Sequence, residues 1–261
     1  MWIEVQGERI FAATGGVAFD PARPAVVLVH GAGMDHSVWT LHDRALAHAG
    51  RAVLSVDLPG HGRSEGEALA SIPALAQWLA ALLDAVGIGQ AAVAGHSMGA
   101  LAALSFAARF PARARAAALL GAAAQMPVNE DLRNAAREKP AAAAAMIVGW
   151  GFSAEAALGG SAAPGLWLTG TATSLLAGAR PGVLAADLEA CNDYADGLSD
   201  AARVRCPALV IAGERDRMSP AKAGRELAAA LPHGDIRVLP GAGHMVMAER
   251  PDAVLDLLQG L

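Results

Sequence analysis

Six short apolar runs alternate with longer segments of helical pattern, and this alternation limits the fold more than any other feature of the chain. Near-continuous apolar runs are typical of parallel strands that helices cover on both faces. The sequence therefore predicts an α/β fold with a mostly parallel central sheet. The runs are residues 25–30, 52–57, 91–95, 116–121, 208–213 and 236–241.

The segments between the runs have the pattern of amphipathic helices. In residues 72–86 the apolar side chains recur with the period of a helix turn. Two short β-rich segments at the start, residues 2–5 and 9–14, flank the turn "QGE" and predict a hairpin. The other predicted helices are residues 37–49, 98–109, 220–231 and 251–258.

The alternation breaks once, from about Gln125 to Ala190. This stretch contains helical patches separated by loops with glycine and proline, and it contains no apolar run of the strand type. A long helical insertion between two strands predicts a lid. We therefore expect a core of residues 1–124 and 191–261 and a helical cap of residues 125–190.

Composition and charge narrow the classes of function. A chain of 261 residues can bury a full core. Much of its 54% hydrophobic content is alanine, and no uncharged apolar run is long enough to span a membrane. The N-terminal residues lack the pattern of a secretory signal, so we expect a cytoplasmic protein. A net charge of −5 without a basic tract gives no surface for nucleic acid.

The motif Gly95-His96-Ser97-Met98-Gly99 falls where an apolar run ends and a helical pattern begins. A serine on a sharp strand-to-helix turn is a nucleophile elbow, in which the glycines let the neighbouring backbone approach. The helix N-terminus would favour negative charge that develops beside the hydroxyl. In the alternative interpretation, Ser97 only caps the helix.

A serine nucleophile needs a base and an acid that orients the base, in the chain order Ser, acid, His on this type of fold. Glu214 and Asp216 both follow a predicted strand and are candidates for the acid. We prefer Asp216, because the loop needs two or three residues to turn inward. His244 follows the next strand through a glycine-rich loop and is the candidate base.

An oxyanion hole needs backbone N–H groups beside the nucleophile. Met98 directly follows Ser97, and the loop "HGAG" after the first buried run lets the N–H of Ala32 point at a substrate oxygen. As a dinucleotide motif the same loop fails, since the third glycine would fall at His36. The sequence has no metal-binding spacing of His, Glu or Cys, so we expect neither a metal nor another cofactor.

Five motifs in this order and spacing resemble the α/β-hydrolase fold family, in its group of capped esterases, lactonases and haloperoxidase-like proteins. The resemblance covers nearly the whole chain except about Gln125 to Ala190. It implies Ser97 as nucleophile, Asp216 as orienting acid and His244 as base, with Ala32 and Met98 as oxyanion donors. The motifs are "HGAGMDHSVW", "DLPGHGRS", "GHSMG", "PALVIAGERDRMSP" and "PGAGHMVMAERP".

The expected activity is hydrolysis of carboxylic esters of small, mainly apolar substrates through an acyl-enzyme. Lactone or enol-lactone hydrolysis, C–C bond hydrolysis, perhydrolysis and a ligand receptor with a hydrolase fold remain alternatives. Gly31 and the cap residues Met126, Trp150 and Trp167 are expected to contact the substrate. We expect a small-molecule ester or lactone as substrate, no membrane or nucleic-acid partner, and a monomer or homodimer.

Overall fold

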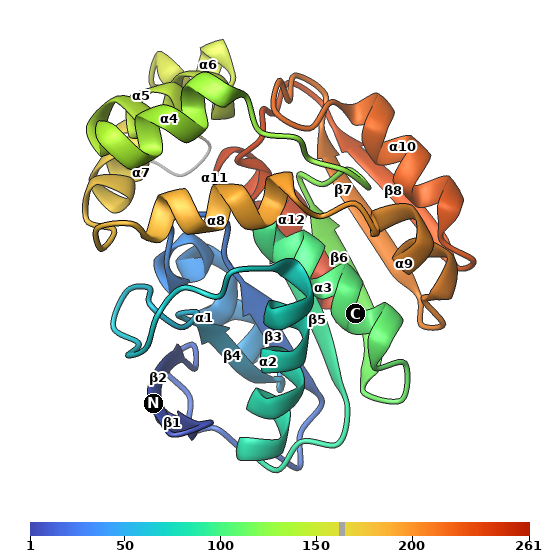
Figure 1. Cartoon of the computed structure of the whole chain (residues 1–261). Coiled ribbons are helices and arrows are strands. Elements are labelled where there is room, and N and C mark those ends of the chain that lie inside the picture. Colours follow the sequence, from blue (N-terminus) through green and yellow to red (C-terminus); the bar gives the residue numbers. More distant parts are fainter. Residues whose placement is uncertain (162–164) are drawn as a thin grey trace.

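The computed structural model describes residues 1–161 and 165–261 and places eight strands in one sheet, in the order β1-β2-β4-β3-β5-β6-β7-β8 (Figure 1). The strands β3 to β8 pair in parallel, whereas the N-terminal hairpin joins the edge antiparallel. The strands are β1 Trp2–Val5, β2 Glu8–Ala13, β3 Ala25–Val29, β4 Ala52–Val56, β5 Ala91–His96, β6 Ala114–Leu120, β7 Ala208–Gly213 and β8 Gly234–Leu239.

The central strands β3, β4 and β5 are buried along their whole length. Their alternate side chains enter two separate cores, one on each face of the sheet. Val27 and Val29 pack on one face with α2 and α3, and Val26 and Leu28 pack on the other with α1 and α12. The helices over the two faces are η1 His36–Trp39, α1 Thr40–His48, α2 Ile72–Ala85, α3 Met98–Arg109, α9 Gly197–Arg203, α10 Ala221–Ala230, α11 Val246–Glu249 and α12 Pro251–Gln259.

One long insertion separates β6 from β7, and its described part is helical. Figure 1 shows α4, α5, α6 and α7 grouped together, with α8 running beneath them. We call residues 125–190 the cap; α8 continues to Asn192 and so crosses the predicted boundary. The helices are α4 Glu130–Glu138, α5 Pro140–Gly151, α6 Ala154–Ala157, α7 Leu168–Ala177 and α8 Val183–Asn192.

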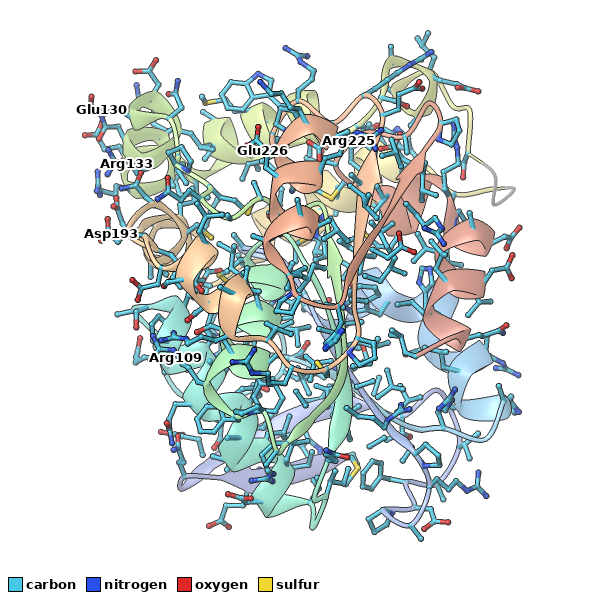
Figure 2. All side chains as sticks on the ribbon, turned by 90° about the vertical axis from the view of Figure 1, so that its right-hand side faces the viewer. Arg109, Glu130, Arg133, Asp193, Arg225 and Glu226 are labelled. Atoms are coloured by element: carbon cyan, nitrogen blue, oxygen red, sulfur yellow. The ribbon has the colours of Figure 1, made fainter. Side chains whose placement is uncertain are left out.

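Ion pairs join two of the cap helices at the surface. Arg133 of α4 lies 3.1 Å from Glu189 of α8, and Arg137 pairs with the same carboxylate. Figure 2 labels Arg133 at the surface of the molecule. Such exposed pairs stabilise a fold only slightly. Among the described helices, none is both long and apolar enough to cross a lipid bilayer.

Candidate active site

Ser97 lies at the strand-to-helix turn that the sequence predicts. It joins β5 to α3 with φ 54° and ψ −117°, a left-handed backbone that costs a residue with a side chain about 1–3 kcal/mol. Its hydroxyl makes no capping hydrogen bond to α3, so the helix-cap interpretation is wrong. A Cβ on Gly95 would lie 2.0 Å from the carbonyl oxygen of Gly99, which explains the glycine at that position.

His244 and Asp216 meet at the same sheet edge. The Nδ1–H of His244 donates to Asp216 Oδ2 at 2.8 Å, and the two side chains are almost completely buried. Burial raises the pKa of Asp216, but the charge and hydrogen bond of His244 and the N–H groups of Ser219 and Met218 together lower it below its ordinary value. Glu214 instead accepts the N–H of Gly241 at the surface, away from the imidazole.

Two small residues that the sequence did not point out support this pair. Ser219 Oγ donates to the carbonyl of Gly121 at 2.8 Å and lies 3.1 Å from His244 Nδ1 and from Asp216 Oδ2. Gly121 has φ +57°, and a Cβ there would lie 3.1 Å from the imidazole. Gly121 leaves room for the imidazole ring, and the hydroxyl of Ser219 contacts both the ring and the carboxylate.

The loop from Gly31 to Met34, which we call the oxyanion loop, lies against Ser97. A Cβ on Gly31 would come within 3.3 Å of the Cβ of Ser97. The N–H of Met34 donates to the carbonyl of Gly31 at 3.2 Å and closes a turn in which Gly33 has φ +66°. Ala32 N–H has no acceptor in the described part of the chain.

Met98 presents a second free N–H beside the serine. It is the first residue of α3, where a helix has no acceptor of its own for the backbone N–H. His96, the residue before Ser97, donates from Nε2 to the carbonyl of His244 at 3.1 Å. Burial and the neighbouring His244 lower the pKa of His96 to about 3, so this ring stays neutral.

These groups surround one cavity of about 240 Å³ between the core and the cap. Gly31, Ala32, Ser97 and His244 line its floor, and the cap contributes mainly apolar side chains. The cap residues and core residues that complete the lining include Met34, Met126, Val128, Leu132, Ile147, Trp150, Leu188, Met218 and Met245. Of the four residues that we expect to contact the substrate, Gly31, Met126 and Trp150 line this cavity.

Trp167 does not line this cavity, contrary to our expectation. Its side chain is 74% exposed at the start of α7. A Cβ on Gly170 would lie 2.2 Å from the indole ring, so Trp167 folds over its own helix. Two other apolar residues of the cap, Phe152 and Leu175, line a second, apolar cavity of about 300 Å³. Apolar residues of the cap therefore line two different cavities, and Trp167 lies at the surface.

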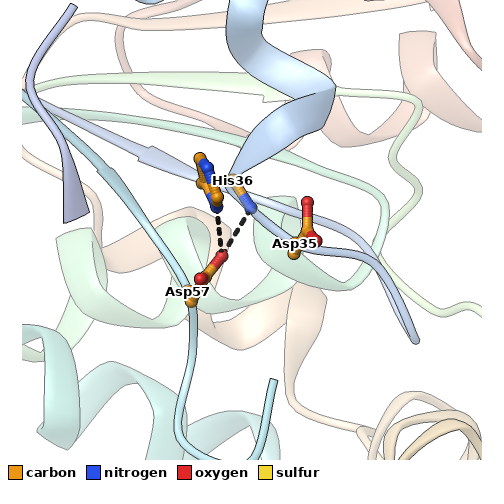
Figure 3. A group of neighbouring side chains, drawn as sticks. All are labelled: Asp35, His36 and Asp57. Atoms are coloured by element: carbon orange, nitrogen blue, oxygen red, sulfur yellow. Dashed lines mark hydrogen bonds and ion pairs between the residues drawn. The ribbon is translucent and has the colours of Figure 1, made fainter. Parts of the chain in front are cut away.

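A group of side chains with metal-ligand atoms, Asp35, His36 and Asp57, lies outside the cavity (Figure 3). Asp57 Oδ1 accepts both the backbone N–H and the Nδ1–H of His36 at 2.7 Å, and its Oδ2 accepts the N–H of Arg63. Asp35 accepts the N–H of Ser37 at the start of a helix. These bonds hold two turns together and account for the cluster.

The mostly parallel sheet, the strained serine after its central strand and the imidazole–carboxylate pair at the same edge define an α/β hydrolase. The chain belongs to the alpha/beta hydrolase family, whose model matches residues 26–257. It is an enzyme of the hydrolase class.

Curated proteins and solved structures agree with this assignment. The chain is 32% identical to a pimeloyl-[acyl-carrier protein] methyl ester esterase of Chromobacterium violaceum, over 85% of this chain and 87% of that protein. It is 31% identical to a dihydrolipoyllysine-residue acetyltransferase component of an acetoin cleaving system of Pseudomonas putida, over 97% of this chain but only 64% of that protein. The enol-lactonase of Burkholderia xenovorans has the same fold, with TM-score 0.85 and 27% identity over 99% of this chain and 98% of that one.

Proposed function

We propose that the protein hydrolyses carboxylic esters of small, mainly apolar substrates, with Ser97 as nucleophile. One observation carries this proposal: His244 Nε2 is buried without a hydrogen-bond partner among the described residues, while Asp216 holds Nδ1. Because the carboxylate accepts a hydrogen bond from the N–H at Nδ1, the neutral ring has a free lone pair on Nε2. That lone pair belongs to a ring that lines the same cavity as Ser97.

The residues around the cavity fit each step of acyl transfer. Ser97 Oγ attacks the acyl carbon as His244 Nε2 takes its proton, and the imidazolium then protonates the leaving alkoxide. Asp216 stabilises the imidazolium in both steps. Water, activated by the same imidazole, attacks the acyl-enzyme and releases the acid.

The backbone would stabilise the negative oxygen of each tetrahedral intermediate. The N–H groups of Ala32 and Met98 flank Ser97 from two different segments, and the start of α3 adds its dipole. A mainly apolar cavity strengthens these interactions because little water competes with them. Loss of one such donor typically slows an enzyme about 10²–10³-fold.

The comparisons support acyl chemistry on esters or lactones. One relative is described as a methyl ester esterase and one structural neighbour as an enol-lactonase. Both reactions attack an ester carbonyl and need the same groups, so the shape and charge of the cavity decide between them. Hydrolysis of a C–C bond on the same residues remains the less favoured alternative.

Substitution of the nucleophile tests the proposal. Ser97→Ala should fold normally, as judged by its circular dichroism and melting curve, and should lose at least about 10³-fold of its turnover of p-nitrophenyl butyrate. Turnover within tenfold of the wild type would contradict the assignment of Ser97. Multiple turnovers by the wild type are expected; a single slow turnover that leaves an adduct on Ser97 would favour a receptor.

Arg217 favours a narrower substrate class, acyl groups that carry a carboxylate away from the scissile bond. Among the described residues that line the cavity, it has the one permanent charge. It is exposed, and no carboxylate in the described part of the chain pairs with it. A guanidinium beside an apolar cavity can take a carboxylate at one end of a substrate whose body stays buried. From the sequence alone we expected small, mainly apolar substrates.

Two esters of equal length separate these classes. We expect the ratio of kcat/KM for p-nitrophenyl hemisuccinate to that for p-nitrophenyl pentanoate to fall about fivefold or more in Arg217→Met. Arg215→Met is the matched control, because Arg215 is also exposed but does not line the cavity. An unchanged ratio in Arg217→Met would leave the neutral ester as the substrate class.

A further inference from the structure

A buried carboxylate of the cap reaches the oxyanion loop. Asp187, in α8, is 1% exposed. Its Oδ2 accepts the backbone N–H of Gly33 at 2.8 Å and lies 2.8 Å from Nε2 of His61. Gly33 and His61 come from two different loops of the core, so one oxygen atom of the cap joins both.

The contacts of His61 favour the charged form of its ring. Both ring nitrogens face acceptors, the carbonyl of Pro59 at 2.9 Å and the carboxylate of Asp187 at 2.8 Å, so both donate. Burial lowers the pKa of His61, but the hydrogen bond and charge of Asp187 outweigh burial and raise it above its ordinary value. Loss of either partner would leave the other as an uncompensated buried charge, so the pair holds both side chains in place.

His30 holds the same loop from the side of the core. Its Nε2 accepts the N–H of Leu58 at 3.1 Å, so its Nδ1 carries the proton and donates to the carbonyl of Gly31 at 2.9 Å. The carbonyl of Gly31 and the N–H of Gly33 are thereby both fixed. Ala32 lies between them, and its N–H meets no acceptor among the described residues.

Packing of the cap leaves the loop little freedom to shift. A Cβ on Gly33 would come within 2.9 Å of Leu184 and 3.2 Å of Leu176. These leucines belong to α8 and α7, so apolar contacts surround the hydrogen bond of Asp187. Without the carboxylate, the N–H of Gly33 would be buried without an acceptor, and the turn would have to rotate to reach another one.

We propose that Asp187 is a positioning residue, which fixes the oxyanion loop so that the N–H of Ala32 points at the developing oxyanion. The inference rests on the proposed function of Ser97. Because the oxyanion forms only during reaction, misplacement of this donor lowers kcat and leaves KM nearly unchanged. A shift of about 1 Å in such a group costs about 10²-fold.

Two substitutions test this role with p-nitrophenyl butyrate. In Asp187→Leu we expect kcat to fall about 10–100-fold while KM stays within about threefold. Asp187→Asn keeps an oxygen that accepts from Gly33, so it should restore kcat to within about fivefold of the wild type. Glu189→Gln is the control, since Glu189 lies on the same helix and pairs only at the surface.

A second readout separates positioning from loss of structure. Phenylboronic acid forms a tetrahedral adduct with a serine nucleophile and places an oxygen in the oxyanion position. The affinity of phenylboronic acid should fall in parallel with kcat in Asp187→Leu. A melting curve gives the folded fraction of the variant, and kcat is calculated for that fraction. A variant with a lower melting temperature but wild-type kcat and boronate affinity would overturn the inference. If Ser97→Ala retains activity, the proposed function fails instead, whatever Asp187 does.

Discussion

Asp216 and Glu214 lie two residues apart after β7, but their carboxylates bind different partners. The backbone N–H groups of Met218 and Ser219 both donate to Asp216 Oδ1 at 2.8 Å, which turns the carboxylate inward and leaves Oδ2 for His244. Glu214 follows the strand directly and bonds to Gly241 at the surface. The local turn therefore decides which carboxylate serves the imidazole.

A pair of isosteric substitutions measures this difference. Asp216→Asn should lower kcat/KM for p-nitrophenyl butyrate by about 10²–10⁴-fold, because the amide cannot stabilise the imidazolium or hold its tautomer. Glu214→Gln should change kcat/KM less than about twofold. The reverse ranking would assign the orienting role to Glu214.

The helices of the cap differ in what they give the cavity. Trp150 near the end of α5 lines it together with Ile147, whereas Trp167 at the start of α7 is exposed to solvent. Substitution of either tryptophan by alanine removes the same bulk, at a position that lines the cavity or at one that does not. The two variants therefore form a matched pair.

We expect Trp150→Ala to change the preferred acyl length. The larger cavity should raise the ratio of kcat/KM for p-nitrophenyl octanoate to that for the acetate by about tenfold, since a methylene in an apolar site is worth about 1–3 kcal/mol. Trp167→Ala should leave this ratio within about twofold. An equal shift in both variants would show that the cap changes shape as a whole.

The sequence predicted the core elements well and the cap poorly, for a physical reason. Buried parallel strands carry continuous apolar runs, and the helix of residues 98–109 was predicted with the bounds that α3 has. In the cap, α7 was missed, because half of its residues are glycine, threonine or serine, which favour a helix only weakly. The bond from Asp187 to Gly33 spans 154 positions, and no local pattern marks which buried carboxylate meets which N–H.

On the scale of the whole molecule, buried histidines connect stability to pH. Burial lowers the pKa of His30 and of His42 to about 4 and that of His96 to about 3. The unfolded chain binds these protons below its ordinary histidine pKa, near 6.5, whereas the folded protein does not. Their contribution to the free energy of unfolding is complete above that pH and is lost as the pH falls toward the folded values. His61 has the opposite sign, because its raised pKa stabilises the fold at lower pH.

Removal of one such ring tests this account. We expect the free energy of unfolding of the wild type to fall by roughly 3 kcal/mol more than that of His42→Leu between pH 7.5 and pH 4. Urea unfolding at several pH values measures the difference. His48→Leu changes an exposed histidine of the same helix and should follow the wild type. Parallel curves for the wild type and His42→Leu would contradict the prediction.

The contact of α8 with the core also limits the route of the substrate. A cap that swung away as one body would pull Asp187 from Gly33 and His61 and strip Leu176 and Leu184 from the loop. That motion would disassemble the oxyanion loop at each opening. We therefore expect entry and product release to use the rim of the cavity where Pro127, Asn129 and Arg217 are exposed, while α8 stays in place.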